Sequence, residues 1–95
     1  MEGEEGGRRA FRVVGRVQGV GFRWWTRRTA VELGLHGWVR NEPDGSVVVH
    51  AGGPEAALSG LEDALRRGPT ASRVDRLEPI EPSGAFRVGE FRIEA

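Results

Sequence analysis

A short glycine-rich segment near the start of the chain separates a strand-like run from a helix-like run. It reads Gly15-Arg16-Val17-Gln18-Gly19-Val20-Gly21-Phe22-Arg23. Because glycine adopts backbone conformations that other residues resist, such a loop can turn several N–H groups inward as an anion cradle. The following helix would direct the positive end of its dipole to the same place. The segment therefore predicts a strand, a tight loop and a helix that together bind a phosphate-like anion, although steric demands alone also produce glycine-rich turns.

Nucleotide-binding versions of this loop do not fit the sequence. A Walker loop requires a lysine beside its last glycine, and all 14 basic residues of this chain are arginine. The dinucleotide fingerprint requires Gly-x-Gly-x-x-Gly, which Gly15, Gly19 and Gly21 do not match. We therefore do not expect ATP or NAD in the loop.

The hydrophobic periodicity predicts an α+β domain of ferredoxin-like type. Its β-α-β-β-α-β order, with an extra C-terminal strand, indicates an antiparallel sheet that carries two helices on one face. Residues 1–8 are acidic and glycine-rich and are expected to form a disordered tail, and residues 9–95 a single domain. The expected strands cover residues 9–15, 36–41, 46–51, 73–80 and 86–93, and the expected helices residues 22–33 and 54–67.

Composition excludes several classes of partner. The 95 residues contain no cysteine, so disulfides, a thiol nucleophile and thiolate metal ligands are ruled out. The net charge is zero, which gives no general attraction to nucleic acid or to a membrane surface. No apolar run could span a bilayer, and the first residues do not resemble a secretory signal. We expect a cytoplasmic monomer with neither a nucleic-acid partner nor a membrane partner.

The usual catalytic side chains are also scarce. His36 and His50 stand in expected strands without metal-ligand spacing, and structural roles are favoured for both. The three aspartates, Asp44, Asp63 and Asp75, fall in a turn, on a helix surface and in a strand. These residues predict no metal site and no pairing of a nucleophile with histidine.

Two motifs resemble a known family. The segment from Gly15 to Arg23 resembles the first signature of the acylphosphatases, and Gly37-Trp38-Val39-Arg40-Asn41 resembles the second. The motifs stand in the right order with one helix between them, and the similarity extends over residues 9–93. The resemblance implies an enzyme that hydrolyses the carboxyl–phosphate bond of small acyl phosphates by in-line attack of water. It further implies that no metal or other cofactor takes part, and that inorganic phosphate or a similar anion binds in the cradle.

The resemblance also implies roles for particular residues. Arg23 would bind the phosphoryl oxygens through its guanidinium, and Asn41 would hold the attacking water through its carboxamide. A carboxylate, either that of Glu94 or that of the chain terminus, is expected to orient Arg23 before substrate binds. The implied phosphate-binding loop consists of Gly15, Arg16, Val17, Gln18, Gly19, Val20, Gly21 and Phe22.

Such a reaction suits a chain without the usual catalytic groups. The leaving carboxylate is a weak base and requires no general acid. Phosphoryl transfer depends mainly on positioning and on stabilisation of charge on the equatorial oxygens. The scarcity of nucleophiles and acids therefore agrees with acyl phosphate hydrolysis.

Two alternatives share the predicted fold. An RRM-type nucleic-acid-binding module presents aromatic side chains on its central strands, whereas residues 46–51 carry none. A non-catalytic anion-binding domain of a larger protein is the other alternative, which we disfavour because we expect the chain to be complete.

Trp24 and Val31 lie on the back of the first helix, where packing against a loop or the tail is favoured over a partner surface.

Overall fold

Five strands and two helices form a single layered unit in residues 6–84 and 88–95, the part of the chain that the computed structural model describes. The expected first helix and the strand after it are found at nearly the predicted bounds. The elements are β1 (Gly6–Arg16), α1 (Phe22–Glu32), β2 (His36–Asn41), β3 (Val47–Pro54), α2 (Glu55–Arg67), β4 (Arg73–Ile80) and β5 (Phe91–Glu94).

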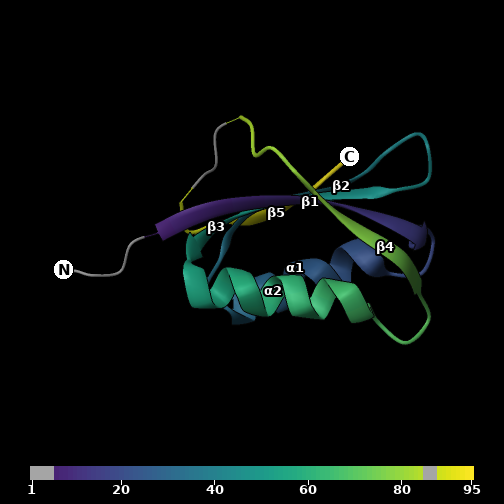
Figure 1. Ribbon diagram of the computed structural model, residues 1–95, viewed down its shortest axis with the longest axis horizontal. Helices are drawn as coiled ribbons and strands as arrows, with labels where there is room; N and C mark the ends of the chain where they lie inside the picture. Colours follow the sequence, from purple (N-terminus) through teal and green to yellow (C-terminus); the bar gives the residue numbers. More distant parts are fainter. Residues whose placement is uncertain (1–5, 85–87) are drawn as a thin grey trace.

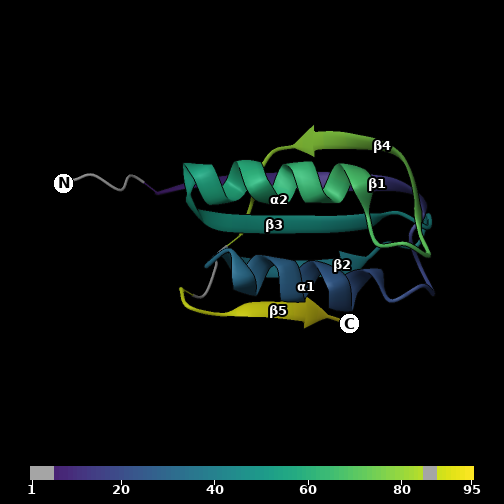
Figure 2. The same cartoon turned by 90° about the horizontal axis from the view of Figure 1, so that it is seen from below.

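The strands form one sheet in the order β4-β1-β3-β2-β5. Both helices cover the same face of this sheet (Figures 1 and 2), which confirms the ferredoxin-like α+β prediction. The first four strands pair antiparallel, but β5 pairs parallel with β2, so the sheet is mixed rather than wholly antiparallel. The reason is topological, because β4 and β5 occupy opposite edges of the sheet and no hairpin can join them. The chain instead crosses to the far edge and returns as β5 in the direction opposite to β4, which is the direction of β2.

Two predicted boundaries were wrong. β1 begins at Gly6, so residues 6–8, expected in the tail, pair with β3 as far as Gly6 opposite Pro54. The extension occurs because β3 runs to Pro54 and offers backbone partners that a glycine-rich composition does not reveal. The last strand begins only at Phe91, after a turn at Val88 and Gly89. Residues 1–5 and 85–87 of the expected tail and strand lie outside the described residues.

The core lies between the sheet and the two helices. Strand residues two apart point to the same face, and most helix-facing positions of the three central strands are apolar and buried, Arg9 and Asn41 being polar exceptions. From the helices, apolar side chains spaced three or four apart cover them. Buried members of this core include Phe11, Val13, Val39, Val47, Val49, Phe22, Ala30, Leu58, Leu61 and Leu65.

Candidate active site

Several segments meet at one end of the sheet. Figure 2 shows the β1–α1 loop, the β2–β3 hairpin and the loop after α2 at this end, toward which β5 runs. A pocket of about 210 Å³ opens here between the β1–α1 loop, the start of α1 and the end of β2. Its walls contain both predicted catalytic residues and four of the eight predicted loop residues. It is lined by Val17, Gly19, Gly21, Phe22, Arg23, Trp24 and Asn41.

Glycine gives the loop its conformation at the pocket. Gly19 and Gly21 have φ angles of 75° and 78°, in the left-handed region, and no neighbouring atom would obstruct a side chain at either position. Both are therefore required for backbone geometry rather than for space. Gly21 is the N-cap of α1, and no side chain caps the helix. The first N–H groups of α1, which have no intrahelical acceptor, thus lie at the pocket together with the positive end of the helix dipole.

The remaining loop residues hold the loop in place. Gly15 sits where β1 approaches β4 so closely that a Cβ atom would lie 2.8 Å from the Asp75 nitrogen. Val17 is buried and Val20 packs against the core. Gln18 donates from Nε2 to the carbonyl oxygens of Glu42 at 2.8 Å and of Ser46 at 2.9 Å. This amide fastens the loop to the hairpin that follows Asn41.

Arg16 is exposed at the end of β1, where it pairs in register with Arg73. It does not line the pocket. The participation of Arg16 in phosphate binding stays a prediction.

Arg23 is oriented by a carbonyl group and not by the carboxylate that we expected. Its Nη1 donates to the Glu94 carbonyl oxygen at 3.1 Å, and one turn later Arg27 Nε donates to the Phe91 carbonyl oxygen at 3.0 Å. Within the described residues Arg23 makes no ion pair with a carboxylate. The alternation of β5 explains this, because the Glu94 side chain lies beside that of Arg92, with which it forms an ion pair, on the face away from α1.

Asn41 reaches the pocket because of its register. It ends β2 two residues after the buried Val39 and pairs with the buried Val47, so its side chain lies on the helix-facing side of the sheet. Its Oδ1 is buried and has no hydrogen-bond donor among the described residues. No described interaction fixes this amide, so rotation about its last side-chain bond can turn either the oxygen or the nitrogen toward the pocket.

The two carboxylates that follow Asn41 in the hairpin are engaged by other residues. Glu42 follows Asn41 directly, but its Oε2 accepts from Arg40 Nε at 2.7 Å. Asp44 Oδ1 accepts from the Ser46 nitrogen at 2.9 Å and from the Ser46 hydroxyl at 2.6 Å, and these hydrogen bonds lower the pKa of Asp44. The negative charge of Glu42 is thus partly compensated by Arg40, and that of Asp44 by Arg12 Nη1 at 3.5 Å.

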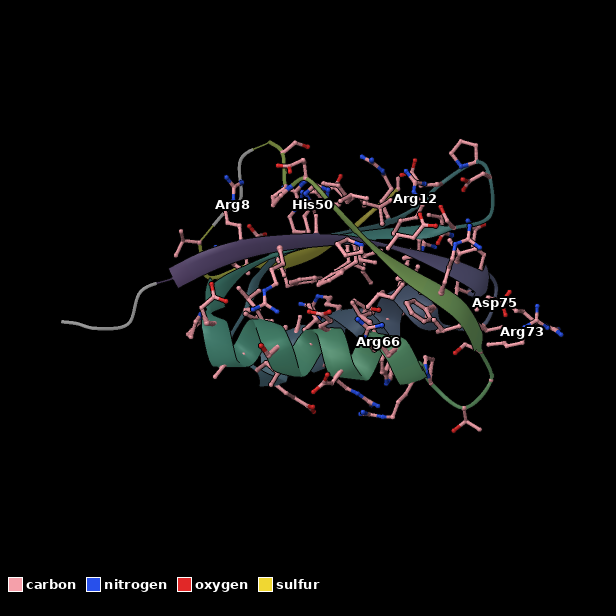
Figure 3. All side chains as sticks on the ribbon, viewed as in Figure 1. Arg8, Arg12, His50, Arg66, Arg73 and Asp75 are labelled. Atoms are coloured by element: carbon pink, nitrogen blue, oxygen red, sulfur yellow. The ribbon has the colours of Figure 1, made fainter. Side chains whose placement is uncertain are left out.

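The helix-free face of the sheet carries the aromatic residue that a nucleic-acid module would need. Trp38 on β2 stacks on His50 of β3, with ring centroids 4.1 Å apart, and the Arg40 guanidinium lies 4.7 Å from the Trp38 ring centroid. His50 points to the side away from the helices, as do Arg8 and Arg12 (Figure 3). The Trp38 ring is thus already in contact with protein side chains, unlike a free platform for base stacking.

His50 has the structural role that the sequence suggested. Its side chain is buried, and burial, followed by the nearby charges of Arg40 and Arg8, lowers its pKa from the ordinary value of 6.5. Among residues 6–84 and 88–95 no group of three histidine, aspartate or glutamate side chains could hold a metal ion. No helix in those residues has the length and apolar character to cross a membrane.

This histidine predicts a pH dependence of stability. In the unfolded chain His50 takes up a proton near pH 6.5, whereas in the folded protein it does so only at lower pH. The free energy of unfolding should therefore fall as the pH is lowered from 7.5 to 5, and fall less in His50→Phe, which keeps an aromatic ring against Trp38. Urea unfolding of both proteins at pH 7.5 and pH 5 measures the free energy of unfolding. An equal pH dependence in the two proteins would refute a lowered pKa of His50 as its cause.

Comparison with known proteins identifies the family. A family model described as acylphosphatase matches residues 9–93. An acylphosphatase of Nitratidesulfovibrio vulgaris (strain DP4) is 64% identical over 70 residues, which are 74% of this chain and 70% of that protein. The chain belongs to the acylphosphatase family. Another member, from Koribacter versatilis (strain Ellin345), is 51% identical over 86 residues, 90% of this chain and 78% of that protein.

The fold agrees with that of solved acylphosphatases. The crystal structure of acylphosphatase from Bacillus subtilis matches with a TM-score of 0.84 and 36% identity, covering 93% of this chain and 98% of that one. The family membership confirms the prediction of an enzyme that hydrolyses small acyl phosphates. Neither the RRM-type alternative nor the non-catalytic anion-binding alternative is favoured.

Sequence reasoning missed three parts of the site. The Trp24 side chain lines the pocket, Gln18 fastens the loop to the hairpin, and the Glu94 carbonyl holds Arg23. Only Trp24 carried a usable signal, because it follows Arg23 in the first turn of the helix and faces away from the buried stripe. A backbone acceptor such as the Glu94 carbonyl cannot be recognised from the sequence, because every residue has a carbonyl group.

Proposed function

We propose that the pocket binds the phosphoryl group of the acyl phosphate, with Arg23 and the N–H groups at the start of α1 as its donors. The supporting observation is that Arg23 and Asn41, the last residues of the two separate signatures, line one pocket. A guanidinium carries five N–H donors, and the Glu94 carbonyl accepts only one hydrogen bond from it here. The others remain available for phosphoryl oxygens in a bidentate arrangement.

In the proposed reaction, water attacks phosphorus in line with the bond that breaks. The water oxygen bonds to phosphorus while the bond from phosphorus to the carboxyl oxygen opens, and the carboxylate leaves with the electron pair. Both protons of the water remain on the inorganic phosphate, where they exchange with solvent. Arg23 and the helix dipole stabilise the charge on the equatorial oxygens throughout.

Asn41 holds the attacking water in this proposal. A buried amide oxygen without a donor is costly, and a water molecule in the pocket would satisfy it once the amide has turned. The same contact would fix the water relative to phosphorus, which lowers the entropic cost of attack. Asn41 therefore acts on the nucleophile, and Arg23 acts on the phosphoryl group.

Metal independence is part of the proposal and has a direct test. Because guanidinium and amide donors carry the charge stabilisation, benzoyl phosphate should be hydrolysed at an unchanged rate after dialysis against EDTA. In water enriched in oxygen-18 the label should appear in the phosphate and not in the benzoate. Loss of all activity in EDTA, or label in the benzoate, would contradict the mechanism. The monomeric state and the cytoplasmic location stay predictions from the sequence.

A further inference from the structure

A second pocket adjoins the one that contains Arg23 and Asn41. It has a volume of about 330 Å³ and shares Gly21 and Trp24 with the first. We had expected the Trp24 side chain to pack against a loop or the tail. It does not, since 70% of the residue is exposed. It therefore stands between the two pockets as a common wall. The second pocket is lined by Gly21, Trp24, Trp25, Arg28 and Pro69.

The second pocket adjoins the first without including Asn41, as a site for the leaving group requires. Asn41 lines the first pocket and does not line the second. An in-line displacement puts the attacking water and the leaving group on opposite sides of phosphorus. With the water held at Asn41, the acyl group of the substrate extends away from Asn41, and the second pocket, which shares Gly21 and Trp24 with the first but not Asn41, is open to it.

The lining of the second pocket combines aromatic side chains with one cationic side chain. Two indole rings and a proline ring provide apolar walls. Arg28 lies one helical turn beyond Trp24, about 6 Å along the axis of α1. Unlike Arg23 and Arg27, which donate to carbonyls of β5, Arg28 forms no hydrogen bond or ion pair with any other residue that the structure describes.

We propose that the second pocket binds the acyl group of the substrate, and that Arg28 selects acyl groups with a carboxylate at the end remote from the phosphate. The inference rests on the proposed binding of the phosphoryl group in the first pocket. Trp24 and Trp25 contact the apolar part of the acyl group, and the unpaired guanidinium of Arg28 meets the distal carboxylate. The preferred substrates are monoacyl phosphates of dicarboxylic acids whose two acid groups are separated by an apolar spacer.

The test compares two rigid substrates, benzoyl phosphate and 4-carboxybenzoyl phosphate, which differ only in the distal carboxylate. The wild-type protein should show a higher kcat/KM for the carboxylated substrate. In Arg28→Gln the ratio of the two kcat/KM values should fall about fivefold, the size expected for an exposed ion pair. Arg66→Gln is the matched control, because it removes one exposed helix arginine on α2, where Arg66 donates to Glu62. Its ratio should equal that of the wild type.

A second variant tests the apolar part. Trp24→Ala should raise KM for benzoyl phosphate about tenfold relative to KM for acetyl phosphate, since only the larger acyl group contacts the indole. An unchanged substrate ratio in Arg28→Gln, or an equal change in Arg66→Gln, would overturn the inference about Arg28. An equal KM change for both acyl groups in Trp24→Ala would overturn the acyl pocket. Failure of the wild type to hydrolyse any of these substrates would instead refute the proposed function.

Discussion

Arg23→Gln is expected to lower kcat/KM for benzoyl phosphate by about a thousandfold, the cost of removing a principal donor to the phosphoryl oxygens. It should also weaken inhibition by inorganic phosphate, because the guanidinium meets the bound dianion as well as the transition state. Glutamine keeps a donor and much of the side-chain length but loses the charge. Steady-state kinetics with phosphate as a competitive inhibitor measure both effects.

Arg27→Gln is the matched control for this variant. Arg27 lies on the same helix and donates to β5 in the same way as Arg23, but it does not line the pocket. Its replacement should leave kcat/KM within about twofold, the range of a surface substitution. Comparable losses in the two variants would show that anchoring of α1 to β5, and not contact with the phosphoryl group, accounts for the effect of Arg23.

Asn41→Ala is expected to lower kcat about a hundredfold while the inhibition constant of phosphate changes less than about twofold. The separation follows from the proposed role, because Asn41 acts on the water and contributes little to binding of the anion. Rates at saturating substrate and the phosphate inhibition constant provide the two numbers. If phosphate binding weakened as much as in Arg23→Gln, Asn41 would have to be reassigned to the anion site.

Much of this site could be predicted from the sequence because local patterns determine it. The alternation of β2 places Asn41 on the same face as Val39, and the helical period of α1 separates the buried Phe22 from Arg23 and Trp24. Glycines at positions 19 and 21 predicted a loop that needs left-handed backbone angles, as found. The prediction that Arg23 and Asn41 belong to one catalytic site came from the family resemblance and not from the strand and helix periodicity.

The parts that could not be predicted depend on contacts distant in sequence. β5 lies at the sheet edge parallel to β2, and short runs of apolar residues do not specify which edge a strand joins. For the same reason Arg23 was expected beside a carboxylate and is found beside the Glu94 carbonyl. Likewise, β1 extends to Gly6 through backbone pairing with β3. Gly6 and Gly7 have no side chain from which a sequence pattern could predict that pairing.

Titration with inorganic phosphate, followed residue by residue through backbone and arginine side-chain nitrogen NMR signals, tests the central claim most directly. The account predicts saturable shifts in the amides of residues 18–24 and in the Arg23 Nε signal, with Asn41→Ala showing the same shifts. Arg8 and Arg12, which lie on the helix-free face, should not respond (Figure 3). Saturable shifts at those arginines without shifts in the loop, or no saturable shift in the loop amides, would contradict phosphate binding in the pocket of Arg23 and Asn41.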